Sequence, residues 1–311
     1  MSSQLTPQAG IFALGTTAHA YLEFDVLAGV EPAAVVSAVG AVARARVTGQ
    51  GSSVVIGFRP SLWRRVAPSP AACPEATDFA EPIVGDDGFT MPATQHDVFV
   101  WIAAGSYDTV FDQTAGVADA LAPVAVLAEE TRGWIYQHDR DLTGFIDGTK
   151  NPPLVEATQV AIAASGQPGE GGSVLLLQRW RHDWAAWSEL GVPGQQDAMG
   201  RTKPDSVELK PLPPTSHVAR TDQDEVGQIF RRNTPYGTVS DHGTVFVGFC
   251  HSQQPLADML HRMAGIGGEP RDELTRYTVA LSGAYYVIPA HEHLPVAPDR
   301  RDGTDGKGAS D

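Results

Sequence analysis

The sequence predicts an α+β fold built from two ferredoxin-like halves, each a βαββαβ unit with an antiparallel sheet. Two observations support it: strand and helix patterns alternate in this order in the first half, and the second half repeats them. No recurring motif supports a duplication, so the prediction rests on element order. The expected parts are an N-terminal half at 1–137, a linker at 138–172, a C-terminal half at 173–297 and a disordered tail at 298–311.

Apolar patterning divides the first half into six elements. Short apolar runs predict strands, and longer segments with helical periodicity predict helices. Between the second and third strands, residues 67–94 are rich in Pro and Gly and predict a long loop. In chain order, the predicted elements are a strand at 19–24, a helix at 32–47, strands at 53–58 and 98–103, a helix at 106–120 and a strand at 124–136.

The second half has the same order with one long interruption. Its predicted elements are a strand at 174–180, a helix at 184–190, a strand at 244–250, a helix at 255–264 and a strand at 277–288. About fifty polar and Pro-rich residues separate the first helix from the second strand, and a structureless interval of this length usually has a functional reason. We therefore expect loops from different parts of the chain to meet at one cleft.

Composition excludes several classes of protein. A formal net charge of −15 disfavours nucleic acid as a partner, because no basic stripe exists to bind phosphates. Cys73 and Cys250 form neither a disulfide framework nor a metal-ligand cluster, which indicates a reducing compartment. The chain starts without a signal-like segment and contains no apolar run of roughly 18 residues, so a cytoplasmic protein with no membrane partner is expected.

The most informative segment is the loop at 144–152, which reads Gly-Phe-Ile-Asp-Gly-Thr-Lys-Asn-Pro. Its glycines allow the backbone to approach a flat ligand closely, and Asp147 lies between them. A lone Asp in this setting is also typical of a turn, where the carboxylate accepts bonds from nearby backbone N–H groups. Both interpretations remain open from this loop alone.

Three segments together resemble the dye-decolourising peroxidases, specifically the compact B-type-like subgroup without an export signal. The first is the 144–152 loop, which resembles the run that presents a carboxylate, here Asp147, over haem iron. The second is Thr-Ser-His-Val-Ala-Arg at 215–220, which resembles the segment carrying the proximal histidine. The third is Arg-Arg-Asn-Thr-Pro-Tyr-Gly at 231–237, which resembles the segment carrying a distal arginine and amide. The resemblance covers most of residues 10–290 and implies haem b in a cleft formed mainly by the C-terminal half.

By this resemblance, His217 is the axial ligand of the haem iron, since a neutral imidazole nitrogen is a suitable ligand. Asp147 is the general base and then acid for the peroxide, Arg231 stabilises charge on the leaving oxygen, and Asn233 orders the peroxide or a water. A slip of one residue would assign the arginine role to Arg232. The remaining histidines lack a matching context: His19, His96, His138, His182, His242, His251, His261, His291 and His293.

Other residues are expected around the cofactor. Ile146, Gly148 and Thr149 belong to the signature loop, and Phe246 matches an apolar wall, although core packing predicts an apolar residue there as well. A Gly-Arg-Thr-Lys stretch at 200–203 offers Arg201 or Lys203 to a haem propionate; an ordinary surface charge cluster is the alternative.

One departure from the family concerns the acid that orients the proximal histidine. Family members often carry this acid where residues 274–277 read Leu-Thr-Arg-Tyr, so Arg276 places the histidine–carboxylate bond in doubt. Asp272 and Asp258 are two candidate substitutes that the sequence does not separate.

The resemblance implies a haem peroxidase that reduces hydrogen peroxide through a ferryl intermediate and oxidises dyes, phenols or similar small reductants by one-electron steps. The alternative is a haem carrier or an iron-release protein of the deferrochelatase kind. A homo-oligomer is expected, whereas the residues at 302–311 lack the Leu and Ile anchors for docking inside a protein nanocompartment. Radical relay through surface Trp or Tyr residues is a further family feature, for which the sequence selects no residue.

Overall fold

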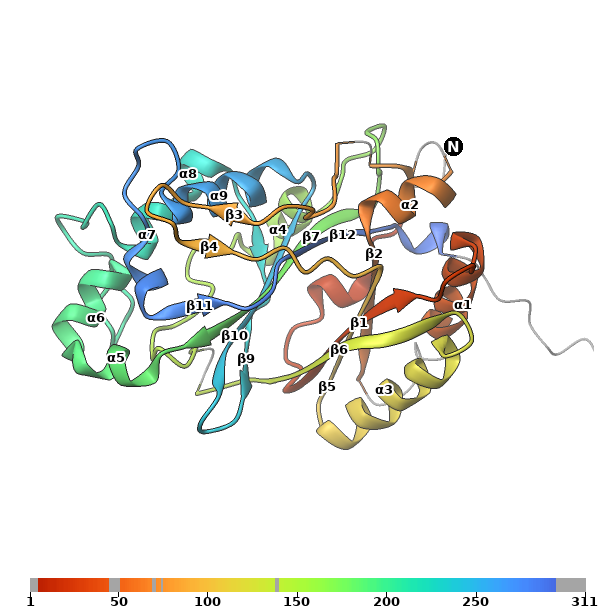
Figure 1. Cartoon of the computed structure of the whole chain (residues 1–311), viewed down its shortest axis with the longest axis horizontal. Helices are drawn as coiled ribbons and strands as arrows, with labels where there is room; N and C mark the ends of the chain where they lie inside the picture. The colour runs from red at the N-terminus through yellow and green to blue at the C-terminus, as the bar shows by residue number, and fades with distance from the viewer. Residues whose placement is uncertain (1–4, 45–50, 69–70, 74, 138–139, 295–311) are drawn as a thin grey trace, which may run out of the picture.

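The computed structural model describes residues 5–44, 51–68, 71–73, 75–137 and 140–294 (Figure 1). Within these residues it is an α+β protein whose strands pair antiparallel, as predicted. The predicted tail at 298–311 and the last three residues of the helix predicted at 32–47 lie outside the described residues. No helix in the described part of the chain has the length and apolar character needed to cross a membrane.

The N-terminal half contains one sheet with the strand order β2-β5-β1-β6. Helices α1 and α3 pack together on one face of it through apolar side chains of both helices (Figure 1). The long Pro/Gly stretch also contains a short hairpin, and a helix that was not predicted precedes it. Because proline suits the first turn of a helix, Pro60 begins that helix. The elements are η1 (Ala9–Phe12), β1 (Ala18–Val26), α1 (Pro32–Arg44), β2 (Ser53–Phe58), α2 (Pro60–Val66), β3 (Ile83–Val84), β4 (Thr90–Met91), β5 (Val98–Ala104), α3 (Tyr107–Leu121) and β6 (Ala125–Trp134).

The C-terminal half has the corresponding order β9-β10-β7-β12. The interval predicted to lack structure contains short helices, two of them capped by side chains: Ser216 accepts from Ala219 N, and Asp222 accepts from Asp224 N. The elements are α4 (Leu154–Ala161), β7 (Ser173–His182), α5 (Trp184–Glu189), α6 (Gly191–Met199), α7 (His217–Arg220), α8 (Gln223–Val226), β8 (Phe230–Arg231), β9 (Thr234–Gly237), β10 (His242–Cys250), α9 (Gln254–Ala264), η3 (Glu273–Arg276), β11 (Thr278–Ala280), β12 (Ala284–Ile288) and η4 (His291–His293).

The strand predicted at 277–288 is instead two strands, β11 and β12, which both pair with β7. The register changes by one residue between them, from Ala280 opposite Trp180 to Ala284 opposite Leu177. At this irregularity the Ser282 hydroxyl, in place of a backbone carbonyl, accepts the hydrogen bond from Arg179 N at 2.9 Å. A one-residue bulge of this kind is not visible in apolar patterning, which is why the prediction was wrong here.

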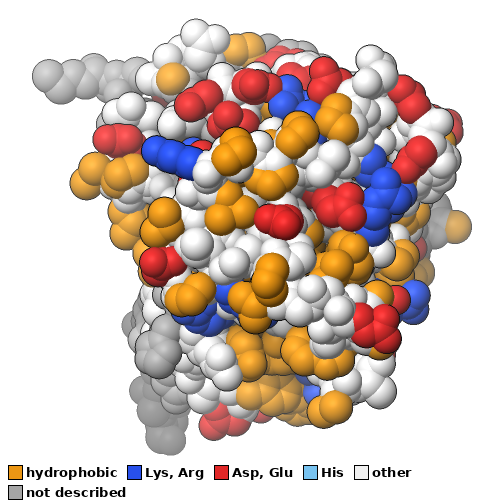
Figure 2. Space-filling model, turned by 90° about the vertical axis from the view of Figure 1, so that its left-hand side faces the viewer, with side chains coloured by type: hydrophobic (Ala, Val, Ile, Leu, Met, Phe, Trp, Pro, Cys, Tyr) orange, Lys and Arg blue, Asp and Glu red, His pale blue; other side chains and the backbone are white. Residues whose placement is uncertain are grey.

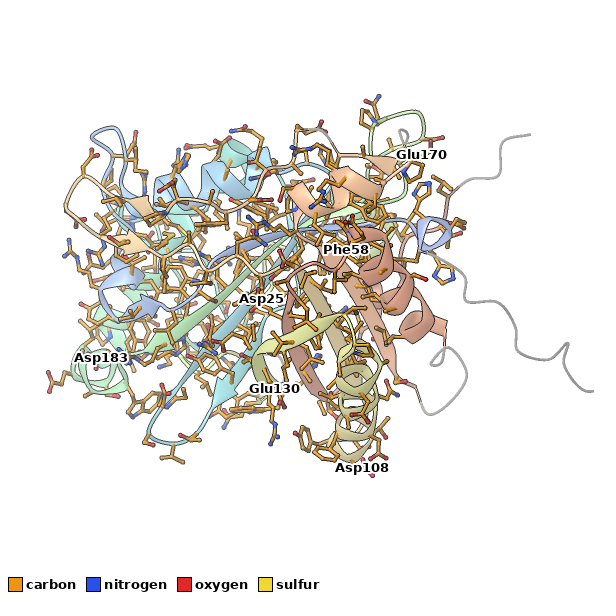
Figure 3. The ribbon with its side chains drawn as sticks, turned by 45° about the vertical axis from the view of Figure 1, so that its right-hand side comes forward. Asp25, Phe58, Asp108, Glu130, Glu170 and Asp183 are labelled. Carbon is orange, nitrogen blue, oxygen red and sulfur yellow. The ribbon has the colours of Figure 1, made fainter. Side chains whose placement is uncertain are left out.

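The two sheets join at both edges instead of standing apart. Val287 of β12 pairs with Phe58 of β2, and Tyr236 of β9 pairs with Gly133 of β6. Phe58 lies near the middle of the molecule, where the halves meet (Figure 3). Strand pairing therefore runs in a closed circuit through both halves. Aromatic and aliphatic side chains fill the space between the sheets, including Tyr21, Trp101, Phe249 and Tyr286.

Polar side chains also connect the halves inside this core. The Tyr286 hydroxyl donates to Glu23 Oε1 at 2.5 Å, and the hydroxyls of Tyr21 and Thr234 share a bond of 3.0 Å. Burial raises the pKa of the Glu23 carboxyl above its usual value, although the bond from Tyr286 opposes the shift. A buried carboxyl depends on such a donor because it has lost contact with water.

Removing the Tyr286 hydroxyl should therefore destabilise the protein. We expect Tyr286→Phe to lower the free energy of unfolding by about 1–3 kcal/mol, the usual effect of leaving a buried acceptor without its donor. Because the pKa of Glu23 is higher in the folded state than in the unfolded state, folding becomes less favourable as pH rises from the ordinary carboxyl range through the raised value. Loss of the Tyr286 hydroxyl should raise the folded-state pKa of Glu23 further. The deficit should thus be larger at pH 7 than at pH 4 in urea denaturation. Tyr107→Phe, at an exposed tyrosine of α3, is the matched control; equal losses in both variants would refute this role.

Candidate active site

One cavity collects the nine residues that the sequence most directly indicates for a functional site. It encloses about 1130 Å³ between protein atoms, counting its open mouth. Its wall comes from the signature loop, from strands β7, β8 and β10, and from helices α7 and α9. Loops distant in sequence thus meet as expected. The predicted residues in the wall are Asp147, Arg231, Asn233, His217, Ile146, Gly148, Thr149, Arg201 and Phe246.

The signature loop holds Asp147 by turn chemistry and at the same time places it in the cavity wall. Asp147 Oδ1 accepts a hydrogen bond of 2.6 Å from Gly148 N, and Gly148 has a φ of +72°. A side chain at Gly148 would be strained in this left-handed conformation and would press on the Asn151 amide. No described donor contacts the second oxygen of Asp147, Oδ2. The two interpretations of this aspartate, turn residue and site residue, are therefore compatible.

Asn151, near the end of the same loop, fixes the backbone of Arg231. Its Nδ2 donates to Arg231 O at 2.8 Å, and its Oδ1 accepts from Arg231 N at 2.9 Å. The guanidinium of Arg231 reaches the cavity wall, and its Nε is buried with no hydrogen-bond partner among the described residues. Burial lowers the pKa of Arg231; the negative charge of Asp147 opposes this effect and the positive charge of Arg201 adds to it. A buried cation with an unpartnered donor is ready to bind an anionic or polar ligand.

The neighbouring arginine has a different function. Arg232 donates to the carbonyls of Ile11 and Ala13 at 2.8 and 2.7 Å, and its guanidinium stacks over the Trp101 ring at 4.9 Å. It does not line the cavity that contains His217. Successive residues of extended backbone point to opposite sides, so only one of the two arginines can face this cavity. Asn233 faces it again, and its Oδ1 accepts from Val247 N at 3.0 Å.

His217 begins helix α7 and is held by a buried acid. Its Nδ1 lies 2.6 Å from Oδ2 of Asp272, whose side chain is 0% exposed. A ring nitrogen that donates to a carboxylate leaves Nε2 as the acceptor, the state required of a metal ligand. Asp272 therefore supplies the carboxylate that the sequence left open between Asp272 and Asp258. Asp258 instead accepts from Gln254 on the exposed side of α9.

The doubt raised by Arg276 is thereby removed, because the acid lies four residues earlier in the chain. Arg276 pairs with Glu273 at 3.2 Å and is half-exposed. Among the described histidines, only His182 shares the cavity with His217. His182 bonds to the Thr244 hydroxyl at 3.2 Å, and burial lowers its pKa to about 4. It has no carboxylate partner among the described residues, so His217 is better suited to hold a metal.

Two further side chains refine the expected cofactor contacts. Arg201 lines the cavity, where it donates to Ser206 O at 2.6 Å and lies 3.5 Å from Glu208. Lys203, the other candidate for a propionate, is not in the cavity wall and donates to Gln195 at 2.6 Å. Of these two cations, only Arg201 can contact a ligand in the cavity without rearrangement.

Asp141, which no motif in the sequence indicates, lies in the cavity wall with Asp147. Burial and the charge of Asp147 raise the pKa of Asp141 to about 6. The only signal in the sequence was its place six residues before Asp147. Met199, Met259 and Met263 also line the cavity, but apolar spacing alone does not distinguish them from ordinary core residues.

The donors in this wall fit a haem. His217 offers a ring nitrogen oriented by a carboxylate, as axial ligands to iron require. Phe246, Met259 and Met263 supply apolar surface for a porphyrin, and Arg201 supplies a cation for a propionate. The unpartnered Nε of Arg231 and the acid Asp147 would remain for a polar ligand of the iron.

Comparison with known proteins agrees with this donor set. Two family profiles match the chain: Dyp-type peroxidase, N-terminal, over residues 8–135, and Dyp-type peroxidase, C-terminal, over residues 138–293. The chain is 32% identical over 267 residues to a dye-decolorizing peroxidase from Rhodococcus erythropolis, which covers 82% of this chain and 76% of the relative.

Two solved structures are similar over nearly the whole chain. The encapsulated DyP-type peroxidase from Mycobacterium smegmatis has a TM-score of 0.83 and 28% identity, covering 94% of this chain and 99% of that one. A variant of DypB from Rhodococcus jostii in complex with heme has a TM-score of 0.78 and 28% identity, covering 94% and 97%.

The chain's two asparagines allow a matched test of the backbone clamp. Asn151→Ala removes two hydrogen bonds to Arg231, so we expect the free energy of unfolding to fall by about 1–3 kcal/mol. Asn233→Ala removes one bond, to Val247 N, and should cost about half as much. Urea denaturation of both variants measures the difference. A smaller loss for Asn151→Ala than for Asn233→Ala would show that the clamp contributes little.

Proposed function

Since the chain belongs to the Dyp-type peroxidase family, and is therefore a haem-dependent peroxidase, we propose that His217 binds the haem iron while Asp147, Arg231 and Asn233 act on hydrogen peroxide. The observation that carries this assignment is the convergence of three separate segments on one cavity, with the His217 ring held by a buried carboxylate. Bound haem supplies the iron that takes up the peroxide and stores the oxidising equivalents passed on to a reductant.

The reaction requires a proton to move from one peroxide oxygen to the other, so that the second oxygen leaves as water. Asp147 is suited to this transfer because it lines the cavity and its Oδ2 has no described donor. Arg231 remains charged despite the lowering of its pKa by burial, since a guanidinium is not deprotonated in proteins. Its unpartnered Nε can stabilise negative charge on the leaving oxygen, and such stabilisation is strong in a desolvated cavity.

Asn233 has a narrower function in this proposal. Because Val247 N donates to its Oδ1, the amide is oriented and its nitrogen has no described acceptor. That nitrogen can donate to a peroxide or a water in the cavity. The Asp272 carboxylate, which is bonded to Nδ1 of His217, would increase the electron density that the His217 ring offers to iron.

The remaining cofactor contacts follow from the wall of the cavity. Ile146, Gly148 and Thr149 would contact the porphyrin through the signature loop, Phe246 through its ring, and Arg201 through a propionate. We propose two ferredoxin-like halves, at 1–137 and 173–297, joined by the 138–172 linker, with the haem cleft mainly in the second half. The matched profiles meet between residues 135 and 138, which supports this boundary.

Small-molecule reductants complete the proposed reaction, with phenols and dyes as the class. On the face shown in Figure 2, acidic, basic and apolar side chains are interspersed. That nucleic acid is not a partner stays a prediction from the net charge of −15. A cytoplasmic location and self-association stay predictions. Encapsulation is reported for the Mycobacterium smegmatis relative and is not proposed for this chain.

Stopped-flow spectroscopy of the haem-loaded protein tests the roles of these residues. Asp147→Ala should slow the reaction with peroxide about 10²- to 10⁴-fold, and Arg231→Leu about 10²- to 10³-fold, while both still bind haem. His217→Ala should lose the haem or change its Soret band, because the axial ligand is gone. Asp258→Ala removes an acid on the exposed side of α9 and is the control. Unchanged peroxide rates in both cavity variants would indicate haem binding without peroxidase chemistry at these residues.

The bond between Asp272 and His217 can be tested by redox titration. Asp272→Asn keeps an oxygen for Leu274 N but removes the charge beside the imidazole. We expect the Fe(III)/Fe(II) potential to rise and the peroxide reaction to slow by about 10- to 100-fold, because a less basic imidazole donates less electron density to iron. Spectroelectrochemistry gives the potential. A potential equal to that of Asp258→Asn would exclude electronic control by Asp272.

A further inference from the structure

A second cavity adjoins the first, and Asp147 of the signature loop and Asp141, six residues before it, lie where the two meet. This outer cavity encloses about 1040 Å³ with its mouth included, and its wall contains Leu14, Tyr136 and Arg140. The residues that it shares with the first cavity are Asp141, Asp147, Gly148, Arg231, Asn233 and Thr244. Asp141 and Asp147 thus separate the proposed haem site from a second space that also opens outward.

The two carboxyls are held in the same manner. Asp141 Oδ1 accepts from Thr143 N at 2.8 Å and from the Thr143 hydroxyl, while Asp147 Oδ1 accepts from Gly148 N at 2.6 Å. No described residue donates to the Oδ2 atom of either aspartate. The loop between them is closed by a bond of 3.0 Å from Asp141 N to Phe145 O. The carboxyls are therefore fixed in position relative to each other, each with one free oxygen.

The charge of Asp147 disfavours ionisation of Asp141. Burial is the main cause of the raised pKa of Asp141, about 6, and the charge of Asp147 is the next. The bonds from Thr143 and the charge of His217 act in the opposite direction. Lys203 also attracts the Asp141 charge, but burial lowers the pKa of Lys203 itself. Because two interacting like charges make simultaneous ionisation unfavourable, the charge of Asp147 favours the protonated form of Asp141.

Two nearby arginines, Arg140 and Arg231, do not lower the pKa of Asp141. The guanidinium of Arg140 is directed at the carbonyls of Gly144, Lys203 and Pro204 at 2.8, 3.0 and 2.9 Å. The pKa of Arg231 responds to the charge of Asp147, and Asp141 is not among its causes. Neither guanidinium is thus among the causes that oppose the raised pKa of Asp141.

We infer that Asp141 and Asp147 form a coupled pair in which Asp141 holds the proton and Asp147 carries the negative charge. The inference rests on the proposed role of Asp147 and adds a residue that acts through it. With Asp141 neutral, Asp147 is the member of the pair that can take the proton from the peroxide. When Asp141 loses its proton to water, a second negative charge lies beside the leaving oxygen and opposes the charge that develops there. The peroxide reaction should therefore slow as pH rises through about 6, the value at which Asp141 ionises.

Infrared spectroscopy detects the proton of Asp141 directly, independently of turnover. Ferric haem-loaded protein, and the haem-free protein alongside it, would carry ¹³C-labelled aspartate, so that Asp carboxyls separate from Glu23 and from the propionates. Between pH 4 and pH 8, wild type should lose one protonated-Asp band, centred near pH 6. Asp141→Asn should lack this band. Asp147→Asn should keep this band, but the band should titrate at lower pH because the neighbouring charge of residue 147 is gone. Glu23→Gln, at a buried acid outside the cavity, should leave it unchanged.

Stopped-flow pH profiles give the second readout. Asn resembles a permanently neutral Asp141 and retains an oxygen for Thr143, so the peroxide rate of Asp141→Asn should stay nearly constant where wild type declines around pH 6. Two results would overturn the inference of a coupled pair: an Asp141 band whose titration is unchanged by Asp147→Asn, or a peroxide rate that still declines around pH 6 in Asp141→Asn. Full peroxide activity in Asp147→Asn would instead refute the proposed base, and the band shift would still decide whether the carboxyls are coupled.

Discussion

The register of β10 against its three partner strands is the constraint on which both the core and the site depend. Phe246 lies opposite Gln178 and Thr244 opposite Trp180, and all four side chains line the cavity. The residues that alternate with them along β10, Val245 and Val247, belong to the core between the sheets. Because side chains alternate along a strand, a slip of one residue would exchange these two sets. Gly243 reinforces the register, since a Cβ there would collide with the backbone of Trp180.

The same strand also determines the electrostatics of the cavity. Val247 orients the Asn233 amide, and Gly248 pairs with Arg231, whose backbone is also clamped by Asn151. Burying a guanidinium is costly, and here the clamp acts on its backbone, leaving the Nε without a described partner. The arrangement does not optimise stability. It places the buried cation Arg231 beside Asp147 in a chain whose net charge is −15. A ligand in the cavity that contacts both Arg231 and Asp147 accounts for this arrangement.

Apolar patterning predicted the main strands and helices, and the motifs together with the family resemblance predicted nine of the residues that line the cavity. Other features depend on tertiary contacts. Asp272 and Asp258 are both acids beside apolar segments, and only the packing of η3 near α6 and α7 brings Asp272 to His217. The bulge between β11 and β12 depends on one serine hydroxyl. Asp141 acquires its unusual pKa from burial and from Asp147, neither of which is visible in a linear sequence.

The tandem arginines show why motif and geometry are both necessary. The pair resembles an exposed basic face, and resemblance to the family selects Arg231 only through spacing. In the fold, the extended backbone points Arg231 to the cavity and Arg232 to the η1 segment and Trp101. Two identical side chains thus acquire different functions: one provides charge to the site, and the other joins the N-terminal segment to the C-terminal half. The positioning of Arg231 therefore depends on the joining of the two halves, because the adjacent Arg232 bonds to the carbonyls of Ile11 and Ala13 in the N-terminal segment.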